Sequence, residues 1–345
     1  MIQVENITKR YGNFTAVDGI SFDIDEGEIV GFLGPNGAGK STTMNMITGF
    51  IEPSDGRIIV DGYDISKKPQ KAKRQIGYMP EGVPLYSDLT VKEFVAYMAD
   101  LKGCEKKTKK EEIKKVLEET GLTEVQNKLT KNLSRGYKQR VSMAGALVGN
   151  PKVIILDEPT VGLDPKQVTE IRTLIKNLGK KHTVILSSHI LSEVSQICNR
   201  VIIINKGKIV AIDTPENLEN KVAQNNVVYV TVEDPGNKMD SIKEKLNNIK
   251  DIQFVVENED KTKKYIIKGE RDIDLRKEIF ETLSKEGITI FEMKKADATL
   301  EDAFMKLIND STNSNNTTEE NDQENQNDDK DEKEISEKEN KKEDK

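Results

Sequence analysis

The chain of 345 residues is long enough for a sizeable core and predicts about two domains. Residues 310–345 carry 14 acidic and 6 basic side chains, so the net charge of −7 belongs to this tail and residues 1–309 sum to +1. The acidic balance is therefore no argument for or against a nucleic-acid partner, and a tail whose only aliphatic or aromatic side chain is Ile335 is expected to be disordered. Cys104 and Cys198 show no metal-type spacing, and no apolar run approaches the roughly 20 residues that span a bilayer. We expect a cytoplasmic chain unless a partner holds it at a membrane.

The first fifty residues predict antiparallel strands followed by a glycine-rich loop. Ile2–Ile7 and Ile20–Ile24 have strand patterns, with turn residues between them. Glu28–Leu33 is an apolar strand that runs into the loop Gly34–Thr42, and Ser41–Thr48 continues as a helix. This strand–loop–helix context and the spacing G-x-x-x-x-G-K-S predict a phosphate-binding loop. Its residues are Gly34, Pro35, Asn36, Gly37, Ala38, Gly39, Lys40, Ser41 and Thr42.

Each residue type in the loop has a physical reason to be there. Gly37 and Gly39 allow the backbone to wrap phosphate oxygens, and successive N–H groups at a helix start favour an anion. Lys40 is predicted to bridge the β- and γ-phosphates of ATP, and the Ser41 hydroxyl to ligate Mg²⁺. The loop therefore predicts a site for ATP and Mg²⁺.

The middle of the chain places a basic helix just before an acidic strand end. Residues 91–132 are helical in pattern, and the octet Leu133–Arg140 opens a further helix with a Ser-x-Gly turn. Val153–Leu156 is a continuous apolar run typical of a buried parallel strand, and it ends on Asp157 and Glu158. Many proteins carry a phosphate-binding loop, but far fewer carry this octet ahead of the acidic strand.

The acidic pair and one histidine are the predicted catalytic groups. Successive residues of a strand point to different sides, so Asp157 can face the metal while Glu158 reaches the water that attacks the γ-phosphate. His189 follows the predicted strand Thr183–Ser187, where it can project toward the γ-phosphate as a sensor. His182 lies in a polar turn and is expected to be exposed.

The alternation of strands and helices up to about residue 220 predicts an α/β fold with a parallel sheet covered on both faces. Residues 225–309 then show a different order, β-α-β-β-α-β, which is the ferredoxin-like arrangement. This part includes a predicted helix over Met239–Ile249 and a closing helix over Leu300–Ile308. We predict a catalytic domain over residues 1–220, a small α+β domain over 225–309 and a disordered tail over 310–345.

These motifs together resemble the nucleotide-binding subunits of ABC transporters, over residues 1–220. The resemblance implies a P-loop NTPase fold with an antiparallel β subdomain and a helical subdomain, and ATP hydrolysis coupled to transport. It also implies that Tyr11 stacks on the adenine ring, and that Ser134 and Gly136 complete the ATP site of a second subunit. The matching segments, in chain order, are Gly34–Thr42 (Walker A), Ile76–Glu81 (Q-loop), Leu133–Arg140 (signature), Val153–Glu158 (Walker B), Gly162–Asp164 (D-loop) and His189 (switch histidine).

The sequence departs from the family pattern in two places. Glu81 stands where the Q-loop has glutamine, and a carboxylate there can still meet Mg²⁺ or its water. In the signature, Arg135 and Tyr137 stand where glycine and glutamine are usual. The likeness is strongest to ABC-2-type exporters of the multidrug and gliding-motility kind, which often carry a small C-terminal domain.

The favoured function is therefore an ATPase subunit that forms a homodimer and drives export through separate membrane permease subunits. This places the chain peripherally on the inner face of the cell membrane, with no nucleic-acid partner. The alternatives are a soluble ABC ATPase that acts on ribosomes or DNA, and an importer subunit. A single cassette without sustained heptads argues against the first, and Glu81 with the small C-terminal domain argues against the second.

Overall fold

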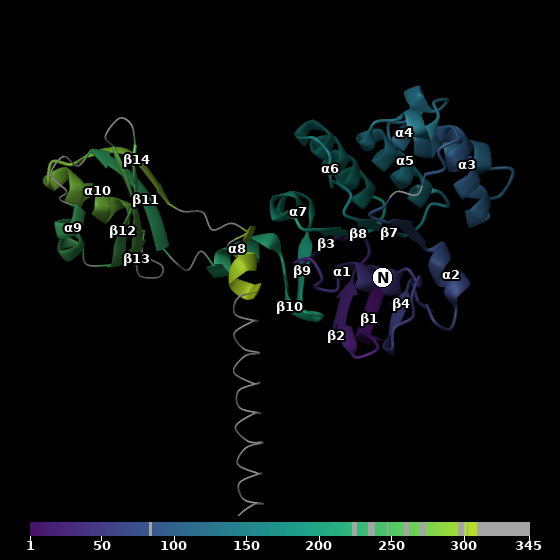
Figure 1. Cartoon of the computed structure of the whole chain (residues 1–345), viewed down its shortest axis with the longest axis horizontal. Helices are drawn as coiled ribbons and strands as arrows, with labels where there is room; N and C mark the ends of the chain where they lie inside the picture. The colour runs from purple at the N-terminus through teal and green to yellow at the C-terminus, as the bar shows by residue number, and fades with distance from the viewer. Residues whose placement is uncertain are drawn as a thin grey trace, which may run out of the picture. The chain divides into compact units, whose positions relative to one another are not determined.

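The computed structural model describes residues 1–82, 85–222, 226–233, 239–246, 248–258, 262–269, 274–295, 300–301 and 303–308. The chain folds into two compact units, one built mainly from Met1–Pro215 and the other from Glu216–Lys306 (Figure 1). The predicted tail lies outside the described residues, and the predicted domain boundaries stay a prediction. No described helix combines the length and the apolar content that crossing a membrane requires.

A six-stranded sheet forms the centre of the first unit. Its strand order is β10-β9-β3-β8-β7-β6, in which only β10 runs antiparallel to its neighbour. Every residue of β3, β7 and β8 is buried, because both faces of this part of the sheet are covered. The strands are β3 (Ile29–Leu33), β6 (Ile76–Met79), β7 (Val153–Asp157), β8 (Thr183–Ser188), β9 (Arg200–Asn205) and β10 (Lys208–Asp213).

The central sheet decides where the functional residues meet. Strands β3, β8 and β7 are hydrogen-bonded neighbours and run parallel, so their carboxyl ends lie at one edge. The glycine loop follows β3, His189 follows β8, and Glu158 follows β7. Ligands of open α/β sheets bind outside this edge.

A second, antiparallel sheet packs on the first through a shared core. Its order is β2-β1-β4-β5, and apolar side chains such as Ile2 and Val17 join Met44 and Ile47 of α1 (Lys40–Ile47) in one buried cluster. Strands β1 and β2 are longer than the predicted Ile2–Ile7 and Ile20–Ile24, because the polar residues up to Tyr11 still pair across the hairpin. The strands are β1 (Ile2–Tyr11), β2 (Phe14–Ile24), β4 (Asp55–Val60) and β5 (Tyr63–Asp64).

Helices α3, α4 and α5 lie together within the first unit and form the helical subdomain (Figure 1). Helix α3 begins at a capping box in which Thr90 and Glu93 satisfy each other's backbone N–H groups. Helix α5 begins after the N-cap Ser134. The helices of this unit besides α1 are α2 (Pro69–Arg74), α3 (Val91–Lys102), α4 (Lys109–Glu119), α5 (Arg135–Leu147), α6 (Pro165–Gly179) and α7 (Leu191–Ile197), with 3₁₀ turns at Thr123–Val125 and Thr130–Asn132. Helix α8 (Pro215–Val222) begins at the last residue of Met1–Pro215 and otherwise belongs to the second unit.

The second unit has the predicted ferredoxin-like order. Its antiparallel sheet runs β12-β13-β11-β14, and α9 and α10 contribute Ile242, Ile279 and Leu283 to its core. Residues 300–308 are helical wherever they are described. The elements are β11 (Asn226–Glu233), α9 (Met239–Ile242), a 3₁₀ turn (Lys243–Lys245), β12 (Ile249–Glu257), β13 (Lys263–Gly269), α10 (Arg276–Lys285) and β14 (Thr289–Lys295).

Two local predictions are wrong. The helix predicted over Met239–Ile249 ends at Ile242, because Ile249 already pairs with Gly269 in the sheet. His182 is only 6% exposed, and its Nδ1 lies 2.7 Å from the carbonyl oxygen of Pro151. The turn residues around His182 are polar in sequence, but the loop before β7 packs over the imidazole.

Candidate active site

The glycine loop has a backbone conformation that favours glycine at two positions. Gly37 and Gly39 have φ of +79° and +107°, in the left-handed region. A Cβ at Gly39 would lie 2.7 Å from the carbonyl oxygen of Ala16, so a side chain there would also collide with β2. The loop therefore holds its N–H groups around the start of α1, as an anion site requires.

Lys40 is held above this loop by backbone carbonyls. Its side chain is buried, and Nζ donates to the carbonyl oxygen of Gly34 at 2.8 Å and to that of Pro35 at 3.2 Å. Burial lowers the pKa of Lys40, and the nearby carboxylates of Glu158, Asp157 and, to a smaller degree, Glu81 oppose this. The ammonium is thus oriented by weak neutral acceptors that phosphate oxygens can replace.

The acidic pair is fixed by a serine that the sequence did not single out. The Ser187 hydroxyl donates to Asp157 Oδ1 at 2.5 Å and accepts from the backbone N–H of Glu158 at 3.0 Å. All three residues are buried. Glu158 has φ of +50°, which turns the chain sharply between the two carboxylates. A polar residue at the end of the apolar strand β8 was the signal that could have identified Ser187.

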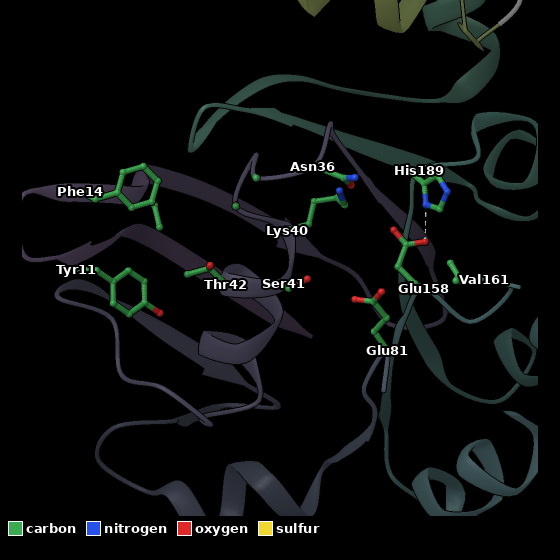
Figure 2. Close-up of a pocket in the computed structure, with 13 residues that line it drawn as sticks. Tyr11, Phe14, Asn36, Lys40, Ser41, Thr42, Glu81, Glu158, Val161 and His189 are labelled. Carbon is green, nitrogen blue, oxygen red and sulfur yellow. Dashed lines mark hydrogen bonds and ion pairs between the residues drawn. The ribbon is translucent and has the colours of Figure 1, made fainter. Parts of the chain in front are cut away.

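His189 contacts the second carboxylate directly. Its Nδ1 lies 2.9 Å from Glu158 Oε2, the contact drawn in Figure 2. The imidazole is 52% exposed, whereas the side chain of Glu158 is 10% exposed. The histidine therefore orients the carboxylate while keeping an open side toward the cavity.

One cavity of about 420 Å³ gathers most of the predicted residues (Figure 2). Phe14, Ala16 and Val161 also line it and were not predicted. Phe14 and Tyr11 flank the β1–β2 turn and are 63% and 51% exposed, so the cavity offers two accessible aromatic rings. Gly34, Pro35, Ala38 and Asp157 do not line the cavity. The predicted residues that do line it are Tyr11, Asn36, Gly37, Gly39, Lys40, Ser41, Thr42, Glu81, Glu158 and His189.

Ser134 and Gly136 do not line this cavity. They belong to a separate hollow of about 250 Å³ between α5 and the start of α6, together with Asp164 and Gln167. The Ser134 hydroxyl accepts weakly from the backbone N–H of Tyr137, at 3.5 Å. One chain by itself therefore does not bring the signature to its own loop.

Arg135, the first departure in the signature, lies against the D-loop. Gly162 has φ of +71°, and a Cβ there would come within 2.7 Å of Arg135 Nη2. The guanidinium thus occupies the space that a side chain at position 162 would need. The start of α5 and the segment that follows Glu158 therefore lie next to each other.

The residues fit Mg²⁺ only together with phosphate. Among the described residues, no group of three or more His, Cys, Asp and Glu side chains is placed to hold a metal. Ser41 lines the cavity, and Asp157, which does not line it, is oriented by Ser187; these two oxygen-bearing side chains are the candidate Mg²⁺ ligands. Mg²⁺ typically takes one or two protein oxygens and completes its shell with substrate phosphates and water.

The Ser187 contacts make a testable prediction. Ser187→Ala should lower the free energy of unfolding by about 1–3 kcal/mol, because a buried carboxylate loses its donor and a buried N–H loses its acceptor. Urea denaturation should measure this loss, with the exposed Ser192→Ala on α7 as the matched control. Equal stability of the two variants would contradict the bridging role.

Comparison with known proteins agrees with this geometry. The family model described as ABC transporter matches residues 17–161. The linearmycin resistance ATP-binding protein LnrL of Bacillus subtilis is 41% identical over 67% of this chain and 75% of its own length. The bacitracin transport ATP-binding protein BcrA of Bacillus licheniformis is 34% identical over 90% of this chain and 98% of its own length. The chain belongs to the ABC transporter ATP-binding proteins.

The family and the fold class that the motifs predicted are therefore confirmed. A solved dimeric structure of the ATP-binding cassette MJ0796, in a post-hydrolysis state bound to ADP and phosphate, superposes with a TM-score of 0.57 at 28% identity. It covers 62% of this chain and 98% of the cassette. Members of this family are in general ATP-hydrolysing subunits.

Proposed function

We propose that this ABC subunit binds Mg·ATP in the Lys40 cavity and hydrolyses it to drive export through separate membrane permease subunits. The observation that carries the proposal is the convergence of Lys40, Glu158 and His189 on one cavity beside the glycine loop. Export is favoured because the relatives named for linearmycin resistance and bacitracin transport align over most of their length. In this proposal the chain lies peripherally on the inner face of the membrane, held by its permease.

The nucleotide is held by residues with distinct tasks. The loop N–H groups and Lys40 bind the phosphates, with Nζ moving from the Gly34 and Pro35 carbonyls to phosphate oxygens. Tyr11 stacks on the adenine ring, and the exposed Phe14 beside it extends the aromatic surface.

Three oxygen-bearing side chains suit the metal. Ser41 and Asp157 would hold Mg²⁺, with Glu81, two residues after β6, as a further oxygen ligand for the ion or its water. When bound, Mg²⁺ neutralises charge on the phosphates.

The catalytic task falls to Glu158. Its carboxylate orients the attacking water and accepts a proton from it, in a position set by the backbone turn at φ +50° and by His189 Nδ1. His189 reports on the γ-phosphate through its exposed side. Little covalent chemistry is required of the protein in phosphoryl transfer, so fixed orientation supplies most of the effect.

Two copies of the chain are needed for a complete site. Ser134 and Gly136 lie at the start of α5, where N–H groups favour a phosphate, yet they do not line the Lys40 cavity of their own chain. In a homodimer, they complete the site of the other copy. The dimeric MJ0796 cassette supports such an arrangement.

The test is ATP turnover by the purified full-length chain. Lys40→Ala should lose nucleotide binding and hydrolysis, since the phosphates lose their main cation, and EDTA should abolish the wild-type activity until Mg²⁺ is restored. The exposed Lys115→Ala on α4 is the matched control and should behave as the wild type. Hydrolysis that survives Lys40→Ala would contradict the proposed function.

A further inference from the structure

Helix α7 carries a buried carboxylate that the proposed mechanism does not use. Glu193 is 8% exposed, and its Oε2 accepts a hydrogen bond from the hydroxyl of Thr160 at 2.5 Å. Thr160 itself is 3% exposed. This is a short, charge-assisted bond between two side chains 33 residues apart in the sequence.

The burial of Glu193 is energetically unfavourable by itself. A carboxylate loses favourable hydration when it is buried, and hydrogen bonding has to offset that loss. Within the part of the chain that the structure describes, Glu193 forms no ion pair with a cation. Thr160 is therefore its main compensation, and an apolar residue on this face of α7 would fit the core at lower cost.

The position of the Thr160–Glu193 bond indicates what it does. Thr160 follows Glu158 by two residues, and Glu193 follows His189 by four. The Glu158–His189 contact at 2.9 Å and the Thr160–Glu193 bond at 2.5 Å thus join the same two segments twice. The first contact is partly exposed to the cavity, whereas the second is buried.

Each segment is also closed locally. The backbone N–H of Val161 donates to the carbonyl oxygen of Glu158 at 3.3 Å, so Thr160 lies within a tight turn. The N–H of Glu193 donates to the carbonyl oxygen of Ile190 at 3.2 Å, so Glu193 is coupled closely to the residues that follow His189. A displacement of either turn is therefore transmitted across the Thr160–Glu193 bond.

We infer that Thr160 and Glu193 are positioning residues that keep the His189 segment aligned with the Glu158 turn. They do not touch nucleotide; they act through the Glu158–His189 contact by fixing the distance between the segments that carry it. The inference rests on the proposed roles of Glu158 and His189. Misplacement of reacting groups by about 1 Å can lower the rate a hundredfold. A bond that prevents such misplacement can therefore justify the energetic cost of burying Glu193.

The first experiment compares variants of Thr160 in the full-length chain. Thr160→Val is isosteric but lacks the donor, and it should lower kcat for ATP by about 10- to 100-fold with the KM for ATP changed by less than about threefold. Thr160→Ser restores the hydroxyl and should recover most of kcat. Thr173→Val, at an exposed position of α6, is the matched control and should behave as the wild type. A Thr160→Val enzyme with wild-type kcat would overturn the inference.

A second measurement separates positioning from general stability. In a His189→Ala background, Thr160→Val should lower kcat by less than about twofold, because the contact through which it acts is already gone. The double variant Thr160→Val/Glu193→Leu removes both polar partners, so it should fold well yet keep the low kcat. Independent, additive losses in the His189→Ala background, or full activity of this double variant, would overturn the inference.

Lys40→Ala in the same assay separates failure of the positioning role from failure of the proposed function. If Lys40→Ala is inactive while Thr160→Val is fully active, only the positioning role fails. If hydrolysis survives Lys40→Ala, the proposed function fails, and the positioning role fails with it.

Discussion

Replacement of Glu158 by glutamine is expected to lower ATP turnover by about a hundred- to ten-thousand-fold while leaving ATP binding intact. Glutamine has nearly the same shape as glutamate, so the turn at φ +50° and the contact with Ser187 through the backbone N–H are retained. The amide is a poor base, and it cannot accept the proton of the attacking water. The loop and Lys40 are unchanged, so the phosphates are still bound.

The consequence of binding without turnover is an accumulated ATP-bound dimer. Size-exclusion chromatography with and without Mg·ATP should show it for Glu158→Gln, and phosphate release should show the lost turnover. Glu111→Gln, at an exposed position of α4, controls for the change of charge. Undiminished turnover by Glu158→Gln would remove Glu158 from the catalytic role.

Substitution of Ser134 by arginine is expected to abolish hydrolysis without damaging the Lys40 cavity of the same chain. Ser134 and Lys40 line different cavities, so a large side chain at the start of α5 cannot obstruct the loop of its own chain by direct contact. In the proposed homodimer, the arginine would obstruct the γ-phosphate bound by the other copy. Loss of the weak N-cap should lower the free energy of unfolding by only about 0.5–2 kcal/mol, and thermal unfolding can measure this effect separately.

Mixing two inactive variants tests directly whether Ser134 of one chain completes the Lys40 site of the other. In a mixed dimer of Ser134→Arg and Lys40→Ala chains, one site contains both defects and the other contains neither. If the sites act independently, an equal mixture should regain roughly a quarter of the wild-type activity, because half of the dimers are mixed and each has one intact site. A mixture of Lys40→Ala with Glu158→Gln places one defect in each site and should regain nothing. Failure of the first mixture, with mixed dimers verified by pull-down of differently tagged chains, would contradict the shared site.

Sequence patterns could predict the proposed binding loop because that loop is local. The loop at Gly34–Thr42 is one continuous segment between a strand and a helix, and its glycine spacing already dictates its conformation. Glu158 and His189 were found for a related reason: each directly follows an apolar strand, and carboxyl ends of parallel strands share one edge.

The residues that escaped prediction act across long stretches of chain. Ser187 reaches Asp157 over 30 residues, and Thr160 reaches Glu193 over 33, so neither contact leaves a periodic trace in the sequence. His182 was expected at the surface because its neighbours are polar, yet it lies under Pro151. The helix predicted from Met239 was cut short by strand pairing at Ile249, which outweighs local propensity.

The sequence by itself therefore determined the family and the fold class, and it named the residues that we propose to meet ATP. Only the tertiary structure decided how they are held: the Ser187 bridge, the buried Thr160–Glu193 bond, and the separation of Ser134 from the Lys40 cavity. The physical reason is register. The β7–β8 pairing aligns Asp157 with Ser187, and that alignment brings the Glu158 turn and the His189 segment together. Local patterns predict each strand, but the pairing that fixes distances between strands is settled by the packed core.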